Sequence, residues 1–296
     1  MRPAPDTSPG AAESGARRRL RRGERMVVIA HRLWDEPHRL LPLSTFAGML
    51  GAAKSTVSED LAFLRRVCER FGLGRVETVA GAAGGVRYAP HRTAGQIRAL
   101  VDEICAKLSD PARALPGGFL HTTDLISTPQ TAAAIGEAFA TLFREARPDV
   151  VLTMEVKGIP LALMTARAFN VPLVTVRRGA GVTEGPSVSV TYVSGSSRLV
   201  QSMTLPLRAI SQGARVLFID DFLRGGGTAR GVYDLMREFR AEVVGIGVLV
   251  ETEHPAEKMV DRHVALVTYR GTGDGEVMVV QSPTLVPARD EGGRDA

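Results

Sequence analysis

The sequence has little cysteine, no clustered histidine and no long apolar run. Its 296 residues include only two cysteines, Cys68 and Cys105, which no metal-binding or redox spacing joins, so we expect reduced thiols in a cytoplasmic protein. The six histidines are scattered without ligand spacing, and we expect no metal site among them. No segment approaches the roughly 18 apolar residues of a membrane span, and the arginine-rich start lacks the apolar part of a signal peptide. These absences predict no membrane partner.

Positive charge is concentrated in the first third of the chain. Residues 1–90 hold 15 Lys and Arg against 9 Asp and Glu, whereas residues 91–296 hold 22 against 23. A basic N-terminal part favours a polyanion such as double-stranded DNA as its partner. A solvated basic face would give the same count, so the charge alone leaves both interpretations open.

The chain begins with a segment that has almost nothing to bury. Residues 1–25 are rich in proline, alanine, glycine and arginine, which predicts a disordered basic tail. Six arginines gather toward its end: Arg17, Arg18, Arg19, Arg21, Arg22 and Arg25. They could lie along nucleic-acid phosphates or remain solvated.

Residues 26–90 carry helical patterns first and strand patterns afterwards. Apolar residues recur at three- and four-residue intervals from Met26 until Pro37 closes the segment, and a second helix is predicted from Ser44 to Leu50. The link at 51–53 is short enough for the turn of a helix-turn-helix.

A third helix and a hairpin complete this part. Thr56 and Glu59 fit a capping box at the start of an apolar stripe that extends over four turns. Two alternating segments, 75–79 and 86–88, flank a glycine-rich turn and predict a β-hairpin. Three helices followed by a hairpin predict a winged-helix domain over residues 26–90.

In a DNA-binding winged helix, the third helix enters the major groove and the wing contacts the backbone. The residues predicted to meet DNA are Lys54, Ser55, Thr56 and Ser58 at the start of the third helix, with Arg75 and Arg87 on the wing. The alternative is a winged helix that contacts another protein.

Strand and helix patterns alternate through residues 91–283. A helix over 93–108 could serve as a linker or a dimer helix, and the strands and helices between 129 and 250 then predict an α/β domain with a parallel sheet. Residues 284–296 are expected to form a C-terminal tail.

The stretch from Val216 to Gly231 indicates a phosphate site. Four apolar residues predict a buried strand over 216–219, and Asp220 and Asp221 follow at its carboxyl end. A run of small residues then leads into a helix: Gly225, Gly226, Gly227 and Thr228. A glycine turn at a helix N-terminus presents N–H groups to an anion. Since carboxylates repel phosphate, the two acids would instead accept hydrogen bonds from ribose hydroxyls or face a hydrated Mg²⁺, which suggests a ribose 5-phosphate.

Two further stretches follow predicted strands and add positive charge. Lys157 and Gly158 precede a helix, so this loop could hold a second phosphate group. Arg178 ends another strand and offers a guanidinium group for phosphate. Ligands of open α/β sheets bind beyond the carboxyl ends of the strands, which favours one shared site. The other phosphate signatures, GxxxxGK[ST] and a GxGxxG after a strand, are absent.

The motif at 216–228 resembles the 5-phosphoribosyl 1-pyrophosphate (PRPP) motif of type I phosphoribosyltransferases, with Arg224 and Gly225 in place of its small pair. Residues 26–283 as a whole resemble the purine operon repressor family of Gram-positive bacteria. The most specific segments are 53–61, 81–86, 115–118, 157–161, 192–197 and 220–228. At Arg224 and Gly225 this family has Lys-Ala, so the contact geometry there is expected to differ.

The resemblance implies a homodimer whose winged helix binds promoter DNA of purine genes and whose phosphoribosyltransferase-like domain binds PRPP, with Mg²⁺ as a further expected ligand. It implies release of DNA by PRPP and no catalysis. The alternative is an active phosphoribosyltransferase that carries a DNA-binding domain, for which residues 182–196 could supply a closing loop. A winged-helix scaffold that binds no ligand would leave the two acids and the glycine run without a role.

Overall fold

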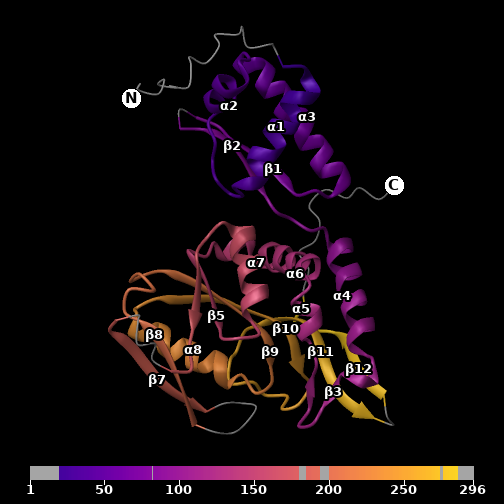
Figure 1. The fold of residues 1–296 in the computed structure, drawn as a ribbon, viewed down its shortest axis with the longest axis vertical. Helices are drawn as coiled ribbons and strands as arrows, with labels where there is room; N and C mark the ends of the chain where they lie inside the picture. Colours follow the sequence, from indigo (N-terminus) through magenta and orange to yellow (C-terminus); the bar gives the residue numbers. More distant parts are fainter. Residues whose placement is uncertain (1–19, 82, 180–184, 194–199, 274–275, 286–296) are drawn as a thin grey trace, which may run out of the picture.

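The computed structural model describes residues 20–81, 83–179, 185–193, 200–273 and 276–285. It shows a small helical domain with a hairpin placed above a larger α/β domain (Figure 1). Most of the predicted N-terminal tail and of the predicted C-terminal tail lies outside the described residues. No helix in the described ranges is long and apolar enough to cross a membrane.

The N-terminal domain has the predicted winged-helix order. Its elements are α1 (Arg22–Asp35), α2 (Leu43–Leu50), α3 (Lys54–Phe71), β1 (Arg75–Val79) and β2 (Gly85–Ala89). The two strands pair antiparallel, with Arg75 opposite Ala89 at the base of the wing. Ile29, Phe46 and Val57, one from each helix, are fully buried in the core of this domain. Both cysteines are free, Cys68 buried and Cys105 partly exposed.

Helix α1 begins earlier than predicted, inside the segment assigned to the disordered tail. The Nε atoms of Arg22 and Arg25 donate to the two carboxylate oxygens of Asp60, at 3.2 Å and 2.7 Å. Asp60 lies on α3 and is only 1% exposed, so its charge requires partners within the protein. Residues 22–25 therefore belong to the winged helix, and the tail prediction is wrong for them.

The start of α3 also differs from the prediction. The helix begins at Lys54 with Ala53 as its N-cap and no side-chain cap, so the capping box of Thr56 and Glu59 is wrong. Gly51 ends α2 in the left-handed conformation, with a φ of 60°, and turns the chain directly into the next helix.

The second domain is built on a six-stranded sheet in the order β12-β11-β10-β9-β5-β6. Its strands are β5 (Val150–Met154), β6 (Leu173–Val176), β9 (Arg215–Leu223), β10 (Glu242–Thr252), β11 (Val264–Gly273) and β12 (Glu276–Gln281). The strands are parallel except for β12, which pairs antiparallel with β11. The α/β class is confirmed, but β11 and β12 were not predicted.

Helices cover both faces of this sheet. One face packs against α4 (Ala94–Leu108), α6 (Pro129–Leu142) and α7 (Ile159–Phe169). The other packs against α8 (Gly227–Glu238) and the antiparallel pair of β7 (Ser187–Val193) and β8 (Val200–Pro206). Figure 1 shows α6 and α7 directly beneath the winged helix. The apolar face of α4, predicted for a linker or a dimer, is buried in the core of its own domain.

Shorter elements complete the second domain. They are β3 (Ala114–Leu115), β4 (Phe119–Leu120) and α5 (Thr123–Ile126), with 3-10 turns at Pro111–Arg113 and Arg144–Ala146. The domain continues past the predicted boundary at 283, because Leu285 is 4% exposed in the core and the Thr284 Oγ1 accepts a hydrogen bond from Ala265 N at 2.9 Å. Thr284 and Leu285 are therefore not part of a tail.

Candidate functional site: an anion cavity at the end of the central strands

The two acids lie inside strand β9 and not after it, which corrects the prediction of a strand that ends at Ile219. Pairing of β9 with β5 stops at Phe218, whereas pairing with β10 continues to Leu223. At Asp220 and Asp221, strand β9 is therefore still paired with β10 but no longer with β5, which leaves an opening on the β5 side. Each is 9% exposed. This is the strand-end position at which open α/β sheets bind ligands.

The glycine loop leads from β9 into helix α8 as predicted. Gly226 caps the helix with a φ of +81°, and a Cβ added there would come within 3.1 Å of Met259 N. Both the backbone conformation and the close neighbour therefore require glycine. The first N–H groups of α8 have no partner within the helix and, together with Thr228, are suited to an anion.

The other side of this loop is held by a lysine that the sequence did not suggest. Lys258 Nζ donates to the carbonyl oxygens of Arg224 at 2.7 Å, Thr252 at 2.6 Å and Pro255 at 2.7 Å. Next to it, Met259 N donates to Gly225 O at 2.9 Å. Residues 258 and 259 thus donate hydrogen bonds to two carbonyl oxygens of the glycine loop, those of Arg224 and Gly225. Burial lowers the pKa of Lys258, and Glu251 opposes that shift.

The loop between β5 and α7 forms the opposite wall. Lys157 lines the cavity, while Gly158 caps α7 behind it. A Cβ on Gly158 would lie 2.3 Å from Thr153 Oγ1 and 2.6 Å from Asp220 Oδ1. Gly158 is thus not a lining residue. Its missing side chain lets the β5–α7 loop approach the acid pair.

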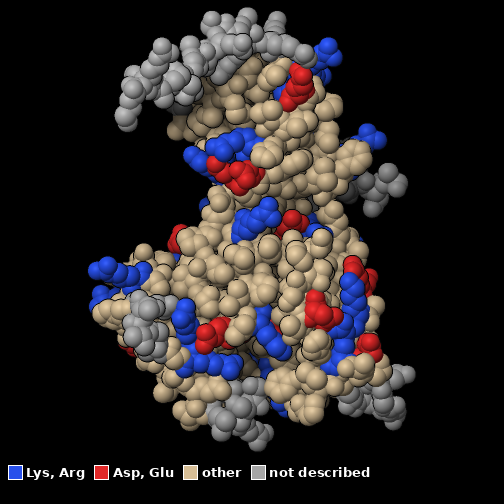
Figure 2. Space-filling view, viewed as in Figure 1, with Lys and Arg blue, Asp and Glu red and all other residues tan. Residues whose placement is uncertain are grey.

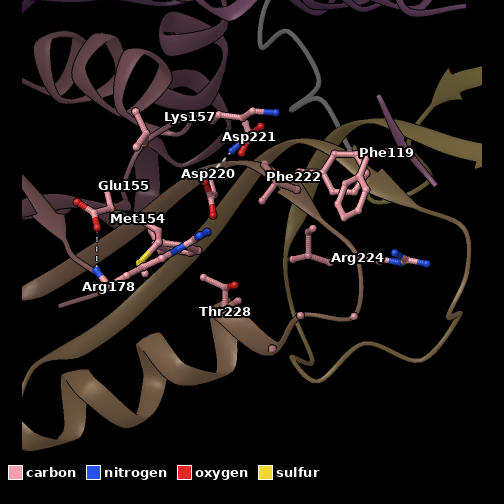
Figure 3. A pocket seen from close by; sticks show the side chains of 18 of the residues that line it. Phe119, Met154, Glu155, Lys157, Arg178, Asp220, Asp221, Phe222, Arg224 and Thr228 are labelled. Carbon is pink, nitrogen blue, oxygen red and sulfur yellow. Dashed lines mark hydrogen bonds between the residues drawn. The ribbon is translucent and has the colours of Figure 1, made fainter. Parts of the chain in front are cut away.

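Arg178 completes the positive wall (Figure 3). Its backbone N–H donates to Glu155 Oε1 at 2.9 Å, which ties the end of β6 to the β5–α7 loop. Its side chain extends toward Asp220, and its charge lowers the pKa of that acid against the effect of burial. The cavity therefore contains cations and acids side by side.

The acid pair is electrostatically unusual. Burial raises the pKa of Asp220 well above its ordinary range, and the adjacent Asp221 raises it further. Burial also raises the pKa of Asp221, with Lys157 as the main opposing influence. Asp221 N donates to Asp220 Oδ1 at 2.9 Å, which orients the first carboxyl. Acids held in this state are suited to hydroxyl groups or to a cation arriving with the ligand.

Arg224 lies at the edge of the cavity. Its Nη1 donates to Gly117 O at 2.7 Å, and its guanidinium lies over the Phe119 ring at 5.6 Å. Phe119 in turn contacts Phe222, with ring centroids 5.6 Å apart. Figure 3 shows this aromatic pair on the side away from Arg178. Phe222 lies within the motif at 220–228 but was not predicted as a site residue, and Phe119 was missed because β4 comes close to β9 only in the fold.

Most of these groups line one cavity of about 260 Å³, whereas Gly158 and Lys258 are not among its lining residues. Of the predicted effector residues, those that line it are Lys157, Arg178, Asp220, Asp221, Arg224, Gly225, Gly226, Gly227 and Thr228. Within the described ranges, no group of three or more His, Cys, Asp or Glu side chains could hold a metal ion. The arrangement suits a ligand with hydroxyl groups between two anionic ends.

The predicted DNA-contact residues fall into two groups. Lys54, Ser55 and Ser58 are exposed at the start of α3, and Thr56 is partly exposed. The two wing arginines have partners within the protein: Arg75 Nη2 lies 3.2 Å from His91 Nε2 at the base of the wing, and Arg87 pairs with Glu77 at 2.8 Å. Figure 2 shows basic side chains on this face of both domains. The DNA contacts themselves stay predictions.

Comparison with known proteins agrees with this two-domain organisation. Residues 21–90 match the family model of the N-terminal part of the bacterial purine repressor, and residues 121–279 match that of the phosphoribosyl transferase domain. The N-terminal match begins at the described start of α1, within one residue. It supports DNA binding by the winged helix.

Relatives of similar length are regulators of transcription. The chain is 44% identical to the purine biosynthesis transcriptional repressor of Bacillus subtilis over 250 residues, covering 84% of this chain and 88% of that protein. It is 39% identical to the purine biosynthesis transcriptional activator of Lactococcus lactis over 248 residues, covering 84% of this chain and 92% of that one. A xanthine phosphoribosyltransferase of Deinococcus deserti is 38% identical over 159 residues, 52% of this chain and 80% of the enzyme. The chain belongs to the family of bacterial purine biosynthesis regulators that join a DNA-binding domain to a phosphoribosyltransferase-like domain.

Proposed function

We propose that this protein represses purine biosynthesis genes by binding promoter DNA and that PRPP, bound in its second domain, releases it. The observation that carries the proposal is the single cavity that combines a glycine phosphate loop, a buried acid pair and two cations, in a chain that begins with a winged helix. PRPP has the matching chemistry, since it carries a 5-phosphate, ribose hydroxyls and a pyrophosphate.

Each part of PRPP has a partner of suitable chemistry. The N–H groups at the start of α8 and Thr228 suit the 5-phosphate. Asp220 and Asp221 suit the ribose hydroxyls, and Lys157 with Arg178 suits the pyrophosphate. Mg²⁺ would arrive on the phosphates of the ligand and contribute charge neutralisation, because the described residues offer no separate metal cluster.

Several finer points belong to the same proposal. We infer that the domain does not catalyse transfer, that the protein is a homodimer and that it works in the cytoplasm, where its DNA lies. Relatives with regulator names support the first point, although they include both a repressor and an activator. Whether this protein represses or activates its target genes is therefore to be measured by transcription from its own purine-gene promoter.

The second candidate is an active phosphoribosyltransferase, favoured by the match to a xanthine phosphoribosyltransferase. The segment that could close such a site, 182–196, lies partly outside the described residues. Base-dependent release of pyrophosphate from PRPP, measured with xanthine, guanine, hypoxanthine and adenine, distinguishes the candidates. Turnover with any of these bases would contradict a non-catalytic domain.

The first experiment titrates PRPP with Mg²⁺ into a complex of the protein and its purine-gene promoter, at fixed salt, and follows fluorescence anisotropy. We expect release at sub-millimolar PRPP and a much weaker response to ribose 5-phosphate. Asp221→Ala should bind DNA normally and lose the response. Tight DNA binding that is indifferent to PRPP would contradict the proposal.

A further inference from the structure

Helix α7 extends from the ligand cavity to the winged helix. Its N-cap, Gly158, follows the cavity residue Lys157, and its last residue, Phe169, packs against the other domain. The Phe169 ring is stacked on the His38 ring, with centroids 6.0 Å apart and planes at 24°. Eleven helical residues span about 16 Å, so one rigid element borders both places. Figure 1 shows α7 at the junction of the domains.

The first turn of α7 is in close contact with the acid pair. Gly158 lies against Asp220 and Thr153 so closely that a Cβ would collide with both. Lys157 influences the charge state of Asp221 from the same loop. An anion that binds Lys157 therefore contacts the residue that precedes the N-cap of α7.

The last turn of α7 meets the loop between α1 and α2, which is hydrogen-bonded to strand β2 of the wing. His38 lies between α1 and α2, and its backbone N–H donates to Tyr88 O of β2 at 2.7 Å. Its Nε2 is buried without a hydrogen-bond partner. Burial lowers the pKa of His38, Arg87 and Arg144 lower it further, and Glu77 raises it. The contact between His38 and Phe169 is therefore a ring contact, to which this nitrogen adds no hydrogen bond.

The junction is also incompletely packed. A cavity of about 200 Å³ lies between Trp34 and Tyr88 of the winged helix and Met164 and Arg167 of α7. Figure 2 shows the molecule narrowing at this level. The winged helix and α7 are therefore separated by open space at this part of the junction.

Helix α6 packs against α7 and adds a second contact with the N-terminal part of the chain. A Cβ on Gly136 would lie 2.6 Å from the backbone of Met164, so the two helices are in direct backbone contact. On α6, Glu137 accepts a hydrogen bond from Arg92 Nε at 3.1 Å, and Thr141 Oγ1 accepts one from Arg92 N at 3.0 Å. Arg92 directly follows the wing. The helix pair thus contacts the loop between α1 and α2 and the segment that follows β2.

We propose that α7 is the element that couples ligand binding to DNA binding. An anion at Lys157 shifts the first turn of α7, and the rigid helix carries the shift to the stack of Phe169 on His38, which reorients the winged helix. This inference rests on the proposed function, because it describes how the same cavity would regulate the same DNA contact.

The test measures linkage between the two ligands. The DNA dissociation constant is determined without PRPP and with saturating PRPP and Mg²⁺, and the PRPP dissociation constant is determined without DNA. Phe169→Leu keeps an apolar side chain in the core but removes the stack. His38→Asn removes the ring and tolerates the left-handed backbone at this position, where φ is 59°. Leu163→Ala, on the exposed face of the same helix, is the matched control.

We expect both variants to lower the PRPP-induced change in DNA affinity by about tenfold, within the range usual for coupling between sites. Each ligand alone should bind as in the original protein, and Leu163→Ala should keep the full effect. If both variants retain the full PRPP effect, α7 does not transmit the signal. If the original protein itself shows no PRPP effect, the proposed function fails instead, so the two failures are distinguishable.

Discussion

At the scale of single residues, the cavity depends on side chains of two kinds. Asp220, Asp221 and the glycines lie in one contiguous motif, and the sequence alone predicts their association with phosphate and ribose. Lys258 and Phe119 come from distant segments without a motif, and only the fold brings them to the glycine loop. Local chemistry could be predicted from the sequence, but contacts between loops could not.

Replacing Lys258 tests the support of the phosphate loop. Lys258→Met should weaken ribose 5-phosphate and PRPP by about tenfold, because three carbonyls lose a charged donor and the loop loses its fixed conformation. Calorimetry on the protein without DNA is the measurement. Inorganic pyrophosphate, which we expect to bind at Lys157 and Arg178, should keep nearly the affinity that it has for the unchanged protein.

The exposed Lys107, which pairs with Glu103 on α4, provides the control, as Lys107→Met removes the same charge far from the loop. Equal losses for pyrophosphate and ribose 5-phosphate in Lys258→Met would show a general loss of structure and not a role at the phosphate loop.

Ligand affinity should depend on pH through the acid pair. Because burial raises the pKa of Asp220 and Asp221, both take up protons at a higher pH than ordinary aspartates, which protonate near pH 4. Protonation removes acceptors for ribose hydroxyls and the attraction for Mg²⁺. The affinity for PRPP should therefore fall when the pH is lowered from about 8 to about 5.

Phosphate protonation, with a pKa near 6, contributes to the same trend. Asp220→Asn removes the contribution of Asp220, since the amide oxygen can still accept the bond from Asp221 N but the amide cannot ionise. The variant should show a shallower pH dependence. An identical dependence in both proteins would exclude Asp220 as its source.

At the scale of elements, hydrophobic periodicity predicted most helices and the alternation of the sheet. Residues 22–25 were assigned to the disordered tail because they offer almost no apolar side chains to bury. Arg22 and Arg25 are nevertheless part of a helix, and both donate hydrogen bonds to the buried Asp60. That contact joins residues far apart in sequence. Strand β9 was predicted to end at Ile219 because two acidic residues follow. Pairing with β10 extends the strand to Leu223, so both acids lie within it.

Asp60 should therefore determine how firmly the first turn of α1 is attached. Asp60→Asn leaves two arginines without their charged acceptor, and we expect the winged helix to lose about 3 kcal/mol of unfolding free energy. Urea unfolding followed by circular dichroism measures this. Glu59→Gln, at the exposed neighbouring position, should change stability by less than about 0.5 kcal/mol. Equal effects would contradict the assigned contact.

At the scale of the whole molecule, charge and ligand chemistry are divided between the domains. The excess positive charge lies in residues 1–90, whereas the anion cavity lies in the second domain. The composition already predicted this division. The relation between the domains could not be predicted, because it depends on aromatic and polar contacts such as His38 with Phe169 that no pattern announces.

The salt dependence of DNA binding should follow the same division. Lys54→Ala should weaken DNA binding and lower the slope of log affinity against log salt by about one unit. Lys107→Met, in the second domain, should leave the slope unchanged. Filter binding or anisotropy over a range of salt concentrations measures it. An unchanged slope in Lys54→Ala would place the phosphate contact elsewhere on the winged helix.

The shared helix α7 has a consequence for how such a sensor can be tuned. One end of α7 borders the ligand cavity and the other contacts the winged helix. Different residues therefore determine the ligand concentration that triggers the response and the size of the change in DNA affinity. Changes around Asp220 or Thr228 shift the ligand concentration that triggers the response, whereas changes at Phe169 or His38 alter how strongly DNA binding answers. A variant can thus respond at a different PRPP concentration while it keeps the full PRPP-induced change in DNA affinity.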